Sequence, residues 1–153
     1  MPRLIKDGDI IETDLLPAEP ARVVAGHILS LEQWQALADK KDSNVQLEPG
    51  DGATPLLEHL AEIALVAVNF PAFTDGRGFS YGRELRERGF SGELRAVGAF
   101  IPDQVDYLAR CGFNAFQFEN EALLEAALPI LQPFSDNYQA DIRQPQPLFR
   151  RRG

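Results

Sequence analysis

The segment at residues 70–83 holds the side chains of this chain that are best suited to chemistry. Its glycines allow a ligand to approach the backbone closely, and arginines near the start of a helix attract anions. Paired N–H groups of Arg77 and Arg83 can hold a phosphate, sulfate, sulfite or carboxylate, and Asp75 can orient an arginine or take a proton. The candidate ligand-binding residues are Thr74, Asp75, Gly76, Arg77, Gly78, Ser80, Arg83 and Arg95, with Asp75 as the candidate catalytic group.

The same segment also has a purely structural interpretation. A tight turn followed by a capped helix start would use Asp75 and Arg77 to satisfy local backbone groups. The glycine spacing, Gly76-x-Gly78-x-x-x-Gly82, differs from a dinucleotide fingerprint, and about seven residues separate it from the preceding strand. A dinucleotide-binding turn needs a tighter link and an acidic residue at the end of the next strand, so that site is disfavoured.

Cysteine and histidine are scarce, which limits the chemistry the chain can do on its own. The single cysteine, Cys111, cannot form an internal disulfide, a redox pair or an iron–sulfur site. His27 and His59 stand far apart without the partner spacing of metal ligands or of a catalytic triad. We therefore predict no metal site and no cofactor motif within the sequence.

The charge balance is acidic. Fifteen Lys and Arg stand against 23 Asp and Glu, a formal net charge of −8 over 153 residues. A general nucleic-acid binder needs a basic face, so we expect no nucleic-acid partner. No apolar run approaches the ~18 residues of a membrane span, and the N-terminal residues lack the apolar core of a signal peptide. We expect no membrane partner and a cytoplasmic location.

Short apolar strands alternate with helical patterns along most of the chain. Residues 3–6 and 10–13 flank an Asp-Gly-Asp turn and predict a small hairpin. Strands are expected at residues 23–25, 45–47, 65–68, 94–98 and 115–118. Helices are expected at 31–39, where Ser30 and Gln33 form a capping box, from 54 to about 63, at 80–88, at 102–110, and from 120 to a limit at Pro129.

This alternation predicts an α/β fold with an open, mostly parallel sheet of four to five βα units. A half-barrel-like arrangement is the alternative, because eight such units would close a barrel. In either fold a site is expected beyond the carboxyl ends of the strands, in the loops after Val68, Val97 and Phe118.

The chain is expected to form a single domain, 1–153. Residues 1–20 read as a peripheral hairpin and linker, and 133–153 as a Pro-rich basic tail. Without Arg150, Arg151 and Arg152, twelve basic residues face 23 acidic ones, so a body of charge −11 precedes a basic end. Such a tail can pack on the acidic body, reach an acidic partner or stay disordered.

Several motifs together resemble one bacterial domain-of-unknown-function family, which is associated with sulfite reduction as an oxidoreductase. They are FPAFTDGRG at 70–78, LRER at 85–88, GELRAVG at 92–98, DQ at 103–104 and RCGF at 110–113. The resemblance is dense over 65–119 and includes the ending at 147–152. Ala99 stands where the family usually has an acidic residue, so an acid catalyst at that position would be missing here.

The resemblance implies a role in assimilatory sulfur metabolism, with sulfite reductase or another sulfate-assimilation enzyme as the partner. Electron transfer would require a borrowed flavin or nicotinamide, or a redox centre in the partner. Three functions follow. The first is an accessory or binding protein with an anion or partner site at 70–83. The second is a small oxidoreductase-type enzyme acting on an anionic metabolite, and the third is an interaction scaffold without a small ligand.

Overall fold

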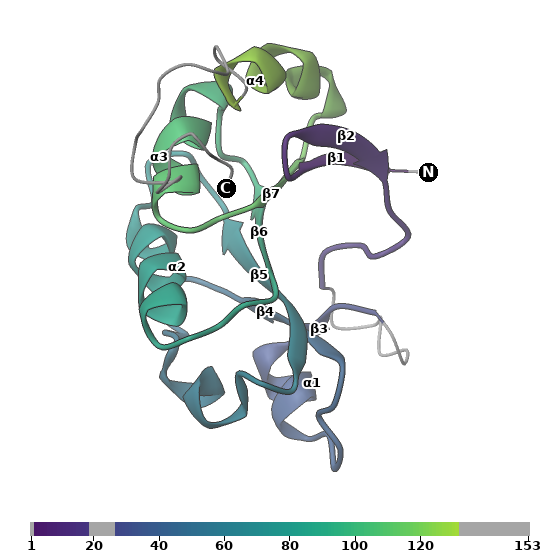
Figure 1. Ribbon diagram of the computed structural model, residues 1–153, viewed down its shortest axis with the longest axis vertical. Coiled ribbons are helices and arrows are strands. Elements are labelled where there is room, and N and C mark those ends of the chain that lie inside the picture. The colour runs from purple at the N-terminus through teal and green to yellow at the C-terminus, as the bar shows by residue number, and fades with distance from the viewer. Residues whose placement is uncertain (1, 19–26, 132–153) are drawn as a thin grey trace, which may run out of the picture.

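The computed structural model describes residues 2–18 and 27–131 (Figure 1). The strand expected at 23–25 and the tail at 133–153 lie outside these ranges. The strands are β1 (Arg3–Lys6), β2 (Asp9–Glu12), β3 (Leu29–Ser30), β4 (Ser43–Leu47), β5 (Ile63–Phe70), β6 (Glu93–Gly98) and β7 (Ala115–Phe118). The helices are α1 (Leu31–Gln35), α2 (Arg77–Glu87), α3 (Val105–Arg110) and α4 (Leu124–Leu131), with 3-10 helices η1 (Thr54–His59), η2 (Pro102–Gln104) and η3 (Glu121–Leu123).

All seven strands form one open sheet in the order β2-β1-β7-β6-β5-β4-β3. Strands β3 to β7 are parallel and adjacent in chain order, and the hairpin β1–β2 joins antiparallel to β7. This confirms the expected mostly parallel sheet with an N-terminal hairpin. The strand order never reverses, so every crossover turns the same way, as in the half-barrel-like arrangement.

The two faces of the sheet differ because successive side chains on a strand point to opposite sides. On the helix face, Val66, Val68 and Phe70 of β5 pack with residues from all four α-helices. Figure 1 shows α2, α3 and α4 following one another along this side of the sheet. On the other face, Leu65, Ala67 and Val97 pack against Leu15 and Ala18. We call this second side the coil face, since residues 13–18 cover it.

The expected helix starts are more accurate than the expected ends. The capping box at Ser30 and Gln33 is present, but α1 ends at Gln35 rather than at 39. Trp34 Nε1 donates to Ser43 Oγ at 2.8 Å, which ties this helix to the start of β4 only a few residues later. The expected helix from residue 54 is the 3-10 helix η1, and Ile63 belongs to β5 rather than to that helix.

Two further boundaries differ from expectation. Helix α2 begins at Arg77, three residues before the expected start; Gly76 is its N-cap, and Asp75 Oδ1 accepts the Arg77 backbone N–H at 3.1 Å. Pro129 lies inside α4 instead of ending it. The proline removes one N–H that would pair with the carbonyl of Glu125, an exposed residue in the first turn, where water can replace that bond. Among the described residues, no helix combines the length and apolar character that crossing a bilayer requires.

Candidate functional site

The predicted residues Asp75 and Arg77 bond mainly to each other, and Arg77 is exposed whereas Asp75 is half-buried. Arg77 Nη2 and Nε reach the Asp75 carboxylate at 2.8 and 3.2 Å. The hydrogen bonds from the Arg77 side chain and backbone N–H hold the pKa of Asp75 below its usual value, and the same pairing raises the pKa of Arg77. A carboxyl group with a lowered pKa stays ionised at neutral pH, which suits an orienting role better than proton exchange.

Other predicted residues of the segment make local or packing contacts. Ser80 Oγ donates to the Arg77 carbonyl at 3.0 Å, and Thr74 is exposed in the turn before α2. Arg83 lies against α3, where its Nη2 contacts Tyr107 Oη at 3.3 Å and Cys111 Sγ at 3.4 Å. Those hydrogen bonds to the thiol and the phenol raise the pKa of Arg83.

The two predicted glycines differ in what surrounds them. Gly76 is the N-cap residue of α2, and a Cβ atom there would meet only the Phe79 ring, at 3.7 Å. Gly78 is buried, and a Cβ atom there would lie 2.7 Å from Phe70 and Val68. Gly78 therefore lets α2 approach β5 closely, which is a packing role.

Arg95 is separated from the rest of the predicted set. It is 2% exposed and lies on the coil face, whereas Arg77 and Arg83 belong to a helix on the opposite face. Its Nε pairs with Glu93 Oε2 at 2.8 Å, and its Nη1 donates to the Leu15 carbonyl at 3.1 Å and to Gln117 Oε1 at 2.9 Å. The structure therefore does not bring the predicted arginines together at one site.

A different set of residues forms a cleft of about 410 Å³ at the carboxyl ends of the parallel strands. We call it the strand-end cleft. Its floor includes one side chain from each of three neighbouring strands, because Asn69 pairs in register with Val97 and Val97 with Gln117. This is the edge of the sheet at which the fold predicts a site, close to the expected loops after Val68, Val97 and Phe118.

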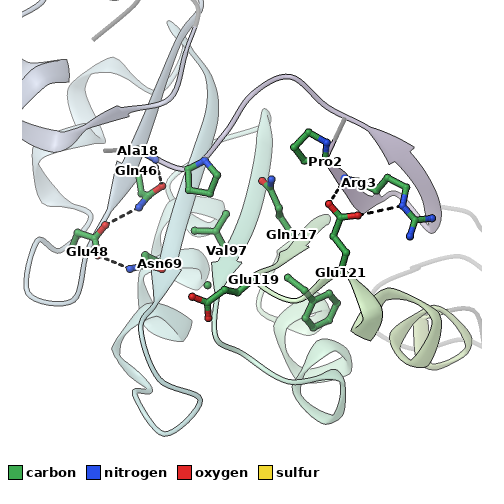
Figure 2. Close-up of a pocket in the computed structure, with 13 residues that line it drawn as sticks. Pro2, Arg3, Ala18, Gln46, Glu48, Asn69, Val97, Gln117, Glu119 and Glu121 are labelled. Atoms are coloured by element: carbon green, nitrogen blue, oxygen red, sulfur yellow. Dashed lines mark hydrogen bonds and ion pairs between the residues drawn. The ribbon is translucent and has the colours of Figure 1, made fainter. Parts of the chain in front are cut away.

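Carboxylates and amides supply the polar lining of the strand-end cleft (Figure 2). Glu48 accepts hydrogen bonds at 2.7 Å from both Gln46 Nε2 and Asn69 Nδ2. Glu121 accepts from the backbone N–H of Arg3 at 3.2 Å and from its Nε at 3.4 Å. Glu119 is exposed, and its carboxylate has no hydrogen bond or ion pair with any part of the chain that the structure describes.

Gln117 has a fixed orientation at the floor of the cleft. The residue is 6% exposed, and its Oε1 accepts from Arg95. A guanidinium group only donates, so the amide oxygen must face Arg95 and the NH₂ group must point away from it. Within residues 2–18 and 27–131 that NH₂ group has no hydrogen-bond partner, and it is not among the buried unpaired atoms, so it is open to the solvent of the cleft.

The charged residues that line the cleft limit which ligands it can bind. Three carboxylates, Glu48, Glu119 and Glu121, face one guanidinium, that of Arg3, giving a net charge of −2. Phosphate groups of a flavin or nicotinamide nucleotide would be repelled there, so the lining does not fit such a cofactor. In the described ranges no group of three or more His, Cys, Asp or Glu side chains is arranged to hold a metal ion.

The strand-end cleft lies at the edge of the sheet where a site was expected, but its lining residues are not among the predicted ones. Polar residues interrupt the strands just before their carboxyl ends, as in Gln46 before Leu47 and Gln117 before Phe118. That pattern, shared by two apolar strands, is the signal that could have found them. Glu119 and Glu48 then follow two residues after each glutamine, and so return to the same side of the sheet.

A family model described as a bacterial protein of unknown function (DUF934) matches residues 44–149, which include all of β5, β6 and β7 and all of β4 except Ser43. No curated protein and no solved structure matches the chain.

Proposed function

Because this chain belongs to the bacterial DUF934 family, whose function is unknown, we propose a function from the site itself: an accessory binding protein of assimilatory sulfur metabolism. Its small-molecule site is the strand-end cleft, and residues 70–83 form a surface for a protein partner. The cleft has the volume range of small-ligand sites and occupies the edge at which parallel α/β folds bind ligands.

One observation carries the ligand-binding part of this proposal. The Gln117 amide is held at the cleft floor by Arg95, and its NH₂ group has no partner in the described chain. This NH₂ group is not among the buried atoms without a partner, so it is open to the solvent of the cleft. A ligand atom that accepts a hydrogen bond from Gln117 would replace that solvent at a donor whose orientation is already fixed, so the floor is prepared for an acceptor atom.

The sulfur-metabolism part rests on the family resemblance of the segments at 70–78 and 92–98. The partner surface has separate support from two exposed aromatic side chains. Phe73 is 54% exposed and Tyr107 is 44% exposed, and the Tyr107 ring lies 5.1 Å from that of Phe79 in α2. Exposed aromatic residues are enriched at protein interfaces, so we propose sulfite reductase or another sulfate-assimilation enzyme as the partner.

The enzyme alternative has weaker support. An oxidoreductase-type reaction on an anionic metabolite would need Asp75 to exchange protons, but the hydrogen bonds from Arg77 lower the pKa of Asp75. It would also need the arginines in one place, and Arg95 lies on the opposite face of the sheet from Arg77 and Arg83.

Ligand binding can be tested by thermal stability against a panel of sulfite, adenylylated sulfate, flavins, nicotinamides and amino compounds. We expect at least one compound to raise the melting temperature, and the shift to fall in Gln117→Glu. This variant keeps an acceptor for Arg95 but removes the NH₂ donor. Glu125→Gln, at an exposed position on α4, is the control and should retain the full shift. No shift with any compound, or equal shifts in both variants, would contradict the cleft as the site.

The partner surface is tested by co-purification with sulfite reductase. We expect wild-type protein to co-elute with the reductase in size-exclusion chromatography and Phe73→Ser to lose that association, because the substitution removes the most exposed large apolar side chain on this surface. Ile11→Ser, which changes a 38% exposed residue on β2, is the matched control. Absence of association in wild-type protein, together with normal growth of a deletion strain on sulfate, would overturn the role.

A further inference from the structure

We propose that the ligand of the strand-end cleft is a small compound carrying both a protonated amine and a hydrogen-bond acceptor such as a carbonyl or hydroxyl oxygen. This inference rests on the proposed function and specifies the ligand class of the same site. It follows from the distribution of charge at the rim and of unpaired donors at the floor.

The rim of the cleft is formed by its charged residues, Arg3, Glu48, Glu119 and Glu121. It carries negative charge that the described chain does not neutralise. Arg3 pairs with Glu121, which leaves the charges of Glu48 and Glu119. Glu48 receives its two hydrogen bonds from the amides of Gln46 and Asn69, and amides carry no charge. Glu119 has neither an ion pair nor a hydrogen bond within the described residues. A ligand cation between these two carboxylates would make charge-assisted hydrogen bonds to them.

Whereas the rim favours a cationic donor, the floor of the cleft favours a hydrogen-bond acceptor. The Gln117 NH₂ group offers donors, and Asn69 Nδ2 already donates to Glu48. Arg95 fixes the Gln117 amide so that it cannot turn its oxygen toward the cleft without losing a charge-assisted hydrogen bond. The ligand atom that reaches Gln117 must therefore be an acceptor, while the ligand group between Glu48 and Glu119 must be a donor.

This arrangement discriminates against simple anions. Sulfite, sulfate or a phosphate could accept a hydrogen bond from Gln117, but each would enter a lining of net charge −2. At separations of about 4 Å, each like-charge pair costs on the order of one to a few kcal/mol, depending on solvent exposure. A protonated amine reverses the sign of that contribution.

The test uses matched pairs of compounds and NMR spectroscopy of the whole chain. L-leucinamide and L-lysinamide carry the amine and the carbonyl. Their N-acetyl derivatives lack the α-amine charge, and N-acetyl-L-leucine is an anion of similar size. We expect the two amines to shift the backbone amide resonances of Asn69, Gly98 and Glu119. N-acetyl-L-leucinamide should bind at least about tenfold more weakly, the loss expected for one hydrogen bond to a charged group.

Variants identify the groups responsible. Glu119→Gln should weaken leucinamide binding about tenfold, and Glu125→Gln should leave it unchanged, since only the first carboxylate lines the cleft. If the acetylated or anionic compounds shift the same resonances as strongly as the amines, the ligand class is wrong while the cleft stands as a binding site. If no compound in this set or in the metabolite panel shifts those resonances, the proposed binding function fails as well.

Discussion

At the scale of single residues, Arg95 connects the stability of the sheet to the geometry of the strand-end cleft. Its buried guanidinium pairs with Glu93, and Glu93 also pairs with Lys6 at 3.3 Å. The same guanidinium donates to Gln117 and to the Leu15 carbonyl, so it joins β6 to β7 and to residues 13–18. Buried charges are tolerated when they are fully paired in this way.

Arg95→Met should therefore be strongly destabilising. Removing one partner of a buried ion pair costs about 3–5 kcal/mol. Here the acceptors on Leu15 and Gln117 lose their donor, and Glu93 keeps only the partly exposed Lys6 as its ion-pair partner. Urea denaturation would measure the change in the free energy of unfolding. The control is Arg3→Met, which breaks an ion pair whose side chains are about 40% exposed and should cost no more than about 1 kcal/mol. Similar losses in both variants would contradict the importance of burial at Arg95.

At the scale of elements, α2 depends on two glycines for its position. A Cβ atom at Gly78 would lie 2.7 Å from Phe70 and Val68, and one at Gly82 would lie 2.4 Å from the Phe113 ring. Both distances are too short for a side chain. Gly78 therefore sets how closely α2 approaches β5, and Gly82 sets how closely it approaches Phe113, two residues before β7.

Gly82→Ala tests this role. Alanine favours a helix over glycine by about 1 kcal/mol, so an exposed position would gain stability. We expect the opposite here, a loss of about 1–3 kcal/mol from overpacking against Phe113. Gly76→Ala is the control, since its φ of −94° suits any residue and the nearest atom lies at 3.7 Å. A rise in the melting temperature of Gly82→Ala would show that the helix can shift away.

The elements also show which boundaries a sequence can predict. Ser30 and Gln33 are three residues apart and cap α1 by local contacts, so the helix start was predictable. Trp34, near the end of α1, is held instead by its hydrogen bond to Ser43, a contact that only tertiary structure creates. Similarly, the glycines near the start of α2 were interpreted as a ligand-binding turn, although Gly78 packs against the sheet.

At the scale of the whole molecule, the parallel sheet was predictable and the cleft lining was not. Strands apolar on both faces, such as 65–68, require cover on both sides, and this favours a parallel sheet. The cleft floor instead depends on register between strands, since Asn69, Val97 and Gln117 meet only after β5, β6 and β7 pair. A contiguous segment such as 70–83 can be recognised as a candidate site from the sequence. Residues about 20 to 28 positions apart cannot, because only strand pairing brings them together.

The assignment of helices to one face and of the cleft to the other has a consequence for engineering. The side chains that line the cleft are separate from those of the helix-packed core, so a mutant library at cleft positions 48, 69 and 119 leaves that core intact. Selection from such a library could change the compound recognised while the scaffold is retained. This chain is therefore a compact starting point for building binding proteins by directed evolution.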